Sequence, residues 1–188
     1  MSRSGLHLAP SGSQSGRVTL LTTLRHAKSS WDDHGLDDFD RPLNDRGRKA
    51  ARSLGRELKR RKVRFDHVIA SPAARVRETI EELAKGYGKL PDVRFDSQIY
   101  EAGAERLLQL IRHIPETAHA PLLVGHNPGM QQLVLALSRE DGNGLRGQVA
   151  EKYPTAAMAL VELEAPRWDE VETHSGTIVE LILPRELD

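Results

Sequence analysis

Four residues that could bind and attack a phosphoryl group are spread through this sequence, each near a point where an apolar run gives way to polar residues. They are Arg25 and His26 after one such run, Arg75 after the second and His126 after the third. A neutral imidazole nitrogen is a competent nucleophile near neutral pH and can form a phosphohistidine intermediate. Guanidinium groups contact phosphate oxygens through paired hydrogen bonds and stay charged at any working pH. The set predicts phosphoryl transfer with His26 as the nucleophile.

Three of these residues also have a plain structural interpretation. His26 could merely follow its strand, and Arg75 could be an ordinary surface arginine with Arg77 as a competitor. His126 could be a buried core histidine, but it lies in the segment 125–129, a strand-to-helix turn where backbone N–H groups and the helix dipole favour an anion. Two neighbours of His26 could assist: the hydroxyl of Ser29 could donate to phosphate, and Lys28 could steer anions to the pocket.

The elements that must position these residues alternate between strands and helices along the chain. We expect strands at 17–24, 68–70, 92–95, 121–124, 156–164 and 177–183, and helices at 44–62, from 72 to the glycines at 86 and 88, at 105–114 and at 128–138. Asn44 is the expected N-cap of the first helix, 92–95 is an expected edge strand, and 141–147 is a glycine-rich connection. This order predicts an α/β three-layer sandwich with a mostly parallel central sheet flanked by helices. Such sheets bind ligands beyond the carboxyl ends of their strands, where the four residues would meet.

Composition restricts the function classes further. The 188 residues suit one domain, which we place at 17–188 after a flexible Ser- and Gly-rich tail at 1–16. Lys plus Arg equals Asp plus Glu at 27 each, so no global field recruits nucleic acid or a membrane surface. The absence of cysteine excludes disulfides, thiolate metal sites and cysteine nucleophiles. With no signal peptide and no apolar run of roughly 20 residues, a cytoplasmic monomer is the expectation.

Two competing interpretations carry less weight. The basic run formed by Arg56, Lys59, Arg60, Arg61, Lys62 and Arg64 has no interleaved aromatic residues for base stacking, so a solvated helix face is favoured over a nucleic-acid site. A metal-dependent hydrolase would have to use His26, His34, His67 and His126, whose spacing matches no metal motif. We therefore expect no metal.

Taken together, the motifs resemble the histidine phosphatase superfamily, also called the phosphoglycerate mutase-like proteins, and most closely its small SixA-type phosphohistidine phosphatase branch. The resemblance covers roughly residues 18 to 187 and rests on the Arg-His motif in 24–29, the stretch 38–47, Ser71-Pro72 with Arg75 and Thr79, the segment 125–129, and the late segments 152–155 and 184–187. The family's usual glycine after Arg-His is Ala27 here, a residue small enough to let the backbone approach a phosphate.

The resemblance implies a role for each residue. His26 would be the phosphorylated nucleophile, Arg25, Arg75 and His126 would form the phosphate pocket, and no metal or organic cofactor would be needed. The position of Thr79 selects Arg75 over Arg77. Glu101 lies where many family members keep an acidic residue, so it is the candidate general acid, with a solvated loop carboxylate as the alternative. Asp32, Asp33 and His34 are further candidates.

The expected function is hydrolysis of phosphohistidine in a protein, such as a phosphotransfer domain, or of a small phosphate ester, through a phosphohistidine intermediate on His26. Two alternatives remain open at this point. The chain could be a catalytically weak phosphate-binding regulatory module that keeps the pocket. It could also be a phosphoglycerate mutase-like phosphotransferase, although such enzymes exclude water with an enclosing insertion, and no segment beyond 92–103 could supply one.

Overall fold

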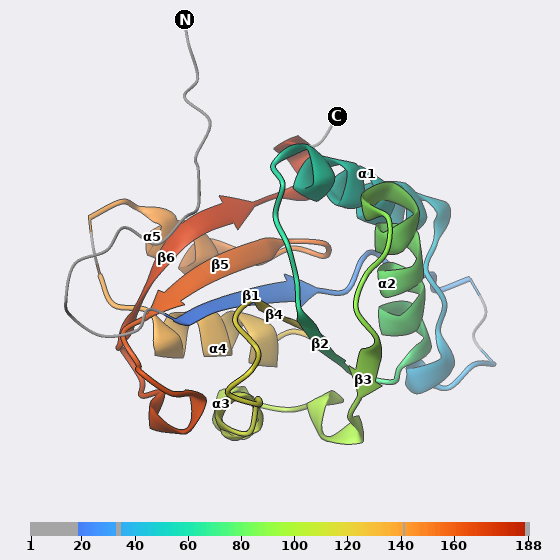
Figure 1. Ribbon diagram of the computed structural model, residues 1–188. Coiled ribbons are helices and arrows are strands. Elements are labelled where there is room, and N and C mark those ends of the chain that lie inside the picture. Colours follow the sequence, from blue (N-terminus) through green and yellow to red (C-terminus); the bar gives the residue numbers. More distant parts are fainter. Residues whose placement is uncertain (1–18, 33–34, 141, 187–188) are drawn as a thin grey trace, which may run out of the picture.

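A six-stranded sheet organises the computed structural model, which describes residues 19–32, 35–140 and 142–186 (Figure 1). The strands are β1 (Thr19–Arg25), β2 (His67–Ala70), β3 (Val93–Phe95), β4 (Pro121–Gly125), β5 (Met158–Leu163) and β6 (Gly176–Ile182). Their order across the sheet is β3-β2-β4-β1-β5-β6. The first four in this order pair in parallel, whereas β5 and β6 are antiparallel to their neighbours. The mostly parallel sheet is confirmed, and β3 lies at its edge as predicted.

Helices cover both faces of the sheet. They are α1 (Asp45–Arg60), α2 (Ala74–Tyr87), α3 (Ala104–Arg112), α4 (Gly129–Leu137) and α5 (Leu145–Glu151), with short 3-10 segments η1 (Asp38–Asp40), η2 (Ser97–Ile99), η3 (Trp168–Glu170) and η4 (Pro184–Glu186). The α1 and α2 helices pack together on one face, and α3 and α4 pack on the other. This arrangement confirms the three-layer α/β sandwich. Among the described residues, no helix has the length and apolar character needed to cross a membrane.

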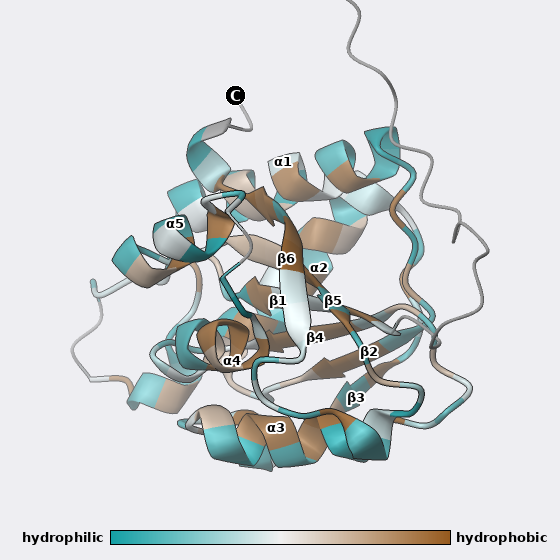
Figure 2. Ribbon diagram, turned by 90° about the vertical axis from the view of Figure 1, so that its left-hand side faces the viewer, coloured by the Kyte–Doolittle hydropathy of each residue, from teal (hydrophilic) through white to brown (hydrophobic). Residues whose placement is uncertain are grey.

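The central strands contribute side chains to both hydrophobic layers because successive residues of a strand point to opposite faces. In β4, Leu122 and Val124 pack with the α1 and α2 side chains, whereas Leu123 packs with those of α3 and α4. All three are almost completely buried. Figure 2 shows the consequence, with mostly hydrophobic strands between helices that are hydrophobic on one side and hydrophilic on the other. This two-sided burial fixes the ends of β1, β2 and β4 relative to one another.

Most predicted boundaries agree with the structure to within about two residues. Asn44 is the N-cap of α1, because its side-chain oxygen accepts a hydrogen bond of 2.8 Å from the backbone N–H of Gly47. The α2 helix begins at Ala74, slightly after the predicted start at Pro72. The predicted tail at 1–16, and the first two residues of the predicted strand at 17–24, lie outside the described residues.

One helix was missed. The glycine-rich sequence 141–147 predicts a connection without a helix, but the structure has α5 at Leu145–Glu151. Its first turn is held by Asn143, whose side-chain oxygen accepts a hydrogen bond from Leu145 N. Gln131 of α4 donates to the carbonyl oxygen of Val149, whose side chain is fully buried. These tertiary contacts outweigh the low helix propensity of the glycines.

The close contact between α1 and the segment after β1 gives a prediction about stability. A Cβ atom on Gly47 would overlap with the carbonyl oxygen of Lys28, whereas a Cβ atom on the exposed, helical Gly147 meets nothing within 4 Å. We expect Gly47→Ala to lower the free energy of unfolding by about 3 kcal/mol. The matched control Gly147→Ala should raise it by roughly 0.5–1 kcal/mol, since alanine favours a helix. Urea unfolding of both variants tests this, and equal unfolding midpoints would contradict it.

Candidate active site

The ends of β1, β4 and β2 bring together the three segments that carry the four candidate residues. Arg25 pairs in register with Gly125. The next residue, His26, donates its backbone N–H to Gly125 O at 3.0 Å, and Ser71 N donates to Val124 O at 3.1 Å. His26, His126 and Ser71 therefore follow three neighbouring strands at the same edge, as expected for ligand binding beyond the carboxyl ends of a parallel sheet.

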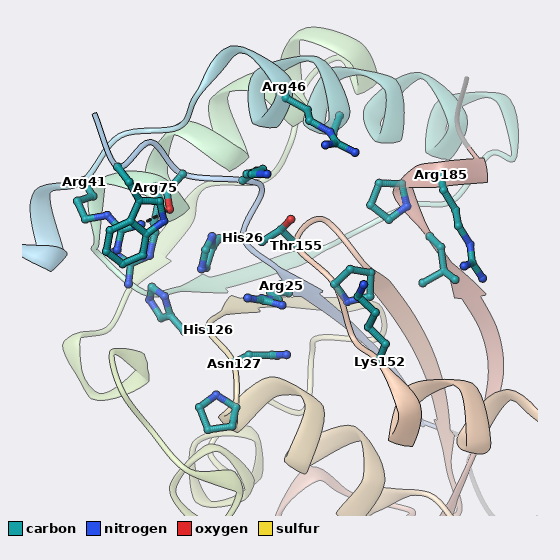
Figure 3. A pocket seen from close by; sticks show the side chains of 18 of the residues that line it. Arg25, His26, Arg41, Arg46, Arg75, His126, Asn127, Lys152, Thr155 and Arg185 are labelled. Atoms are coloured by element: carbon teal, nitrogen blue, oxygen red, sulfur yellow. Dashed lines mark hydrogen bonds between the residues drawn. The ribbon is translucent and has the colours of Figure 1, made fainter. Parts of the chain in front are cut away.

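A pocket of about 980 Å³ lies at this edge. It is lined by seven of the residues singled out from the sequence, namely Arg25, His26, Lys28, Ser29, Arg75, Glu101 and His126. Figure 3 shows His26 and Arg25 near its middle, with His126 on one side and Thr155 on the other. The competitor Arg77 does not line the pocket. Its guanidinium stacks on Phe95 and donates to Pro72 O on the exposed outer side of α2.

The hydrogen bonding of His26 determines which ring nitrogen can react. Nδ1 lies 2.7 Å from the carbonyl oxygen of Ala27. A carbonyl oxygen can only accept, so Nδ1 must carry the proton, and in the neutral ring Nε2 keeps its lone pair. Nε2 has no hydrogen-bond partner within the described part of the chain, and His26 lines the pocket. His26 is therefore oriented to present a nucleophilic Nε2 to a ligand.

Burial and neighbouring positive charges keep both histidines neutral. Burial lowers the pKa of His26 to about 4; the hydrogen bond to Ala27 opposes this shift, and the charges of Arg75 and Arg25 add to it. Burial also lowers the pKa of His126 to about 3, with smaller contributions from His26 and Arg75. The two rings lie 5.2 Å apart between centroids. A neutral His26 is the form that can attack phosphorus, so no general base is needed to activate it.

These lowered pKa values predict how stability depends on pH. In the unfolded chain both histidines would bind protons below about pH 6.5, while in the folded protein they stay neutral. The unfolded state then holds more protons, so the free energy of unfolding should fall as the pH drops from about 6.5 to 5, by up to about 1.4 kcal/mol per pH unit for each histidine. Urea unfolding across this range measures the slope. His126→Gln should reduce it by about half, and an unchanged slope would contradict the prediction.

Arg25 is anchored at the floor of the pocket. Its Nη1 donates to the carbonyl oxygen of Tyr153 at 2.8 Å, and the same oxygen accepts from Asn127 Nδ2 at 2.9 Å. Tyr153 is itself buried and its hydroxyl donates to Thr23 O of β1. The Nε of Arg25 is buried without a hydrogen-bond partner within the described residues. The guanidinium thus uses one of its five donors on this carbonyl, which leaves others for an anion.

Arg75 lines the pocket from the first turn of α2. It is almost fully buried and donates to both the backbone oxygen and the carboxylate of Asp38, the latter at 2.8 Å. Thr79, one turn later, donates to Arg75 O at 2.6 Å and accepts from Ala27 N at 2.9 Å. Thr79 therefore ties the backbone beside His26 to the helix that carries Arg75. This contact gives a physical reason for the spacing of the motif that contains both residues.

Three side chains around Arg75, those of Asp38, Arg41 and Tyr100, could not be assigned from the sequence. Asp38 accepts from Tyr100 OH at 2.9 Å and from Arg41 Nη1 at 2.6 Å, in addition to Arg75. Burial opposes ionisation of Asp38, but the hydrogen bond from Tyr100 and the charge of Arg75 hold its pKa below the usual value. The ring of Tyr100 packs edge-on against His126 at 5.4 Å. An ionised Asp38 thus orients two arginines, and its only signal in the sequence is its place in the stretch 38–47.

The remaining candidates occupy different positions. Ser29 is buried, and its Oγ accepts from Arg41 Nη2 at 2.6 Å, which leaves its own proton free to donate. Lys28 and Glu101 are exposed at the pocket. Asp32 does not line the pocket, and its carboxylate instead accepts from Ser30 Oγ at 2.7 Å. Asp33 and His34 lie outside the described residues, so the structure places neither of these candidate acids.

The second histidine is fixed by Ser71. His126 Nε2 and Ser71 Oγ lie 2.8 Å apart, and both residues are buried. The Nδ1 atom of His126 is buried without a partner within the described part of the chain. Across those same residues, no group of three or more His, Cys, Asp or Glu side chains is arranged to hold a metal ion. The pocket therefore offers arginine and imidazole groups, which suit an oxyanion.

Comparisons with known proteins point to the same chemistry. The family model described as histidine phosphatase superfamily (branch 1) matches residues 21–117. An uncharacterised protein of Mycobacterium leprae is 31% identical over 167 residues, which cover 86% of this chain and 100% of that protein. A crystal structure from Agrobacterium tumefaciens, provisionally described as the phosphohistidine phosphatase SixA, is 28% identical with a TM-score of 0.73 and covers 88% of this chain and 98% of its own. The structure of a protein histidine phosphatase SixA complexed with tungstate is 22% identical with a TM-score of 0.70, over 90% of this chain and 100% of that one.

Proposed function

Because this chain belongs to the histidine phosphatase superfamily, we propose that it is a phosphatase that removes the phosphoryl group from phosphohistidine in a protein through an intermediate on His26. The proposal rests mainly on the state of His26. Its ring is neutral, its proton is held on Nδ1, and its Nε2 is free in the pocket that Arg25, Arg75 and His126 also line. The likeness to the SixA structure from Agrobacterium tumefaciens, which also has the phosphoglycerate mutase-like fold, supports phosphohistidine as the substrate.

The first step transfers the phosphoryl group to the enzyme. His26 Nε2 attacks phosphorus in line with the leaving group, so an N–P bond forms at His26 while the bond to the substrate's imidazole breaks. Charge on the equatorial oxygens is stabilised by the guanidinium groups of Arg25 and Arg75. A substrate imidazole that is already protonated leaves as a neutral ring, so this substrate needs no strong acid from the enzyme.

The second step returns the enzyme to its starting form. Water attacks the phosphohistidine, the N–P bond to His26 breaks, and inorganic phosphate is released. The pocket opens to solvent, since Lys28, Asp38 and Glu101 on its lining are exposed, so water has access to the intermediate. This access favours hydrolysis over return of the phosphoryl group to a second acceptor.

Trapping the intermediate tests the proposal. Phosphohistidine peptide carrying labelled phosphate is mixed with the enzyme in EDTA, quenched within milliseconds and analysed for label on the protein. We expect label that is stable in base and labile in acid, as an N–P bond is, located at His26, together with release of inorganic phosphate. Release without labelled protein would contradict the proposal, as would release that EDTA abolishes.

Hydrolysis of a small phosphate ester is a second candidate, and the place of Glu101 on the pocket lining favours it. An alkoxide leaving group needs a proton, which a pocket carboxyl could supply. If Glu101 is that acid, Glu101→Gln should lower kcat/KM for glycerol phosphate by about 100-fold and leave phosphohistidine hydrolysis nearly unchanged. Steady-state kinetics on both substrates measure this. Equal effects on both would show that Glu101 is not a general acid.

A further inference from the structure

The pocket has a second group of basic residues, distant from the phosphoryl-binding end. Arg46 lies in the first turn of α1, Lys152 directly follows α5, and Arg185 lies in η4 after β6. All three are exposed and line the pocket. Figure 3 shows them on the far side of His26 from Arg75 and Arg41. We call these three residues the basic rim.

The elements that carry the basic rim are in contact. The α1 helix contacts η4, and α5 contacts β6, which leads into η4. The three cations therefore approach the pocket from three segments that are far apart in the sequence. Glu151 is the acidic side chain next to Lys152 on the lining. Basic side chains outnumber acidic ones along the whole described lining by seven to three, although the chain has no net charge. The positive field is concentrated at this pocket.

The basic rim also differs in its pairing from three arginines of α1. Arg48, Arg52 and Arg60 each form an ion pair with a glutamate, with N–O distances of 2.9 Å for Arg48 and 2.6 Å for Arg60. Within the described residues, Arg46, Lys152 and Arg185 have no ion pair and no side-chain hydrogen bond. Three unpaired cations around one pocket repel one another, so an anion that reaches all of them would be stabilised.

The opposite side of the pocket carries an exposed aromatic residue. Trp31 is 68% exposed, the highest exposure among the large hydrophobic residues described. The buried guanidinium of Arg41 lies against its ring, 3.1 Å from the centroid, and donates to Ser29 and Asp38. This stacking holds the indole in place before any partner binds. Tryptophan is enriched among the residues that contribute most to protein–protein binding, so an exposed indole at the pocket suits a protein partner.

From these observations we infer that the basic rim and Trp31 form a docking surface for an acidic protein segment around the phosphorylated residue. The occupant is a folded domain or peptide that carries aspartates or glutamates beside its phosphohistidine. This inference rests on the proposed function, because it concerns how the same pocket selects its substrate. Exposed Lys and Arg side chains act mainly on the encounter rate, so the selectivity should fall as salt increases.

The experiment compares two phosphohistidine peptides that are identical except that glutamates near the phosphohistidine are replaced by glutamines. For wild type at low salt, we expect kcat/KM to be about tenfold higher for the acidic peptide. The triple variant Arg46→Ala, Lys152→Ala, Arg185→Ala should reduce this ratio to near one. The control is Arg56→Ala, Lys59→Ala, Arg64→Ala, which removes the same charges from exposed positions outside the pocket and should keep the ratio.

Four results separate this inference from the proposed function. Hydrolysis of neither peptide by wild type would overturn the proposed function, and the docking inference with it. Equal hydrolysis of both peptides by wild type would overturn the docking inference alone. An unchanged ratio in the basic-rim variant would also overturn the docking inference. So would a basic-rim variant that loses activity only on small phosphates bearing a second anionic group, because the rim would then select metabolites and not protein segments.

Discussion

Replacing His26 by alanine should lower kcat/KM for a phosphohistidine peptide by about four orders of magnitude or more and abolish the labelled protein intermediate. The reason is that Nε2 of His26 is the atom that bonds to phosphorus, and no other pocket group can take its place. The second histidine, His126, is fixed on Ser71, and its pKa is also lowered, but its ring lies 5.2 Å from that of His26. It therefore cannot occupy the position from which His26 attacks.

Two further variants serve as controls for His26→Ala. His113→Ala removes an exposed imidazole at the end of α3, outside the pocket, and should keep full activity. His26→Gly leaves a space that free imidazole can enter, so added imidazole should restore phosphate release without restoring label on the protein. Phosphate release and label are measured in the same quenched samples. A His26→Ala variant that keeps more than about a tenth of wild-type turnover would show that phosphorus is attacked by another group.

Loss of Arg75 should have the second largest effect. Arg75→Ala should lower kcat/KM by about three orders of magnitude, mainly through kcat, because the guanidinium stabilises charge that develops on the transferring phosphoryl group. Arg75→Lys should recover only part of this loss. A lysine ammonium cannot present two parallel N–H donors to phosphate, nor can it hold the carboxylate and backbone oxygen of Asp38 as Arg75 does.

Arg77→Ala is the matched control for Arg75, since it removes the same side chain one half-turn along α2. Arg77 stacks on Phe95 outside the pocket, so its loss should leave kcat/KM within about twofold of wild type. Inhibition by inorganic phosphate separates binding from chemistry: Arg75→Ala should weaken it far less than it lowers kcat. If Arg75→Ala raised KM alone and kept kcat, Arg75 would contribute to binding only and not to the transition state.

The sequence predicts the juxtaposition of Arg25, His26, Arg75 and His126 because parallel strands place their carboxyl ends at one edge, whatever the distance along the chain. Local sequence patterns are sufficient to place these residues at that edge, since each follows an apolar run. The contacts of Asp38 could not be predicted in this way. They depend on how the loop between β1 and α1 folds over α2, and that packing leaves no periodic signal.

The α5 helix is a second feature that sequence patterns could not predict. It has only seven residues, includes Gly147 and follows further glycines, so its intrinsic helix propensity is low. Its backbone is held by Gln131 from α4 and its core residue is the buried Val149. Contacts between elements decide its structure, and no window along the sequence contains them. The basic rim depends on this helix, because Lys152 directly follows it.

The pairing of Arg25 with Gly125 makes enzymatic activity a sensitive reporter of correct folding. Side chains of a strand alternate between faces, so a shift of β4 by one residue against β1 would leave helix and sheet content almost unchanged. It would nevertheless carry His126 away from Ser71 and from the ring of His26. During refolding, circular dichroism would not distinguish the shifted pairing from the native one, whereas the regain of phosphatase turnover would count only molecules whose strands are correctly aligned.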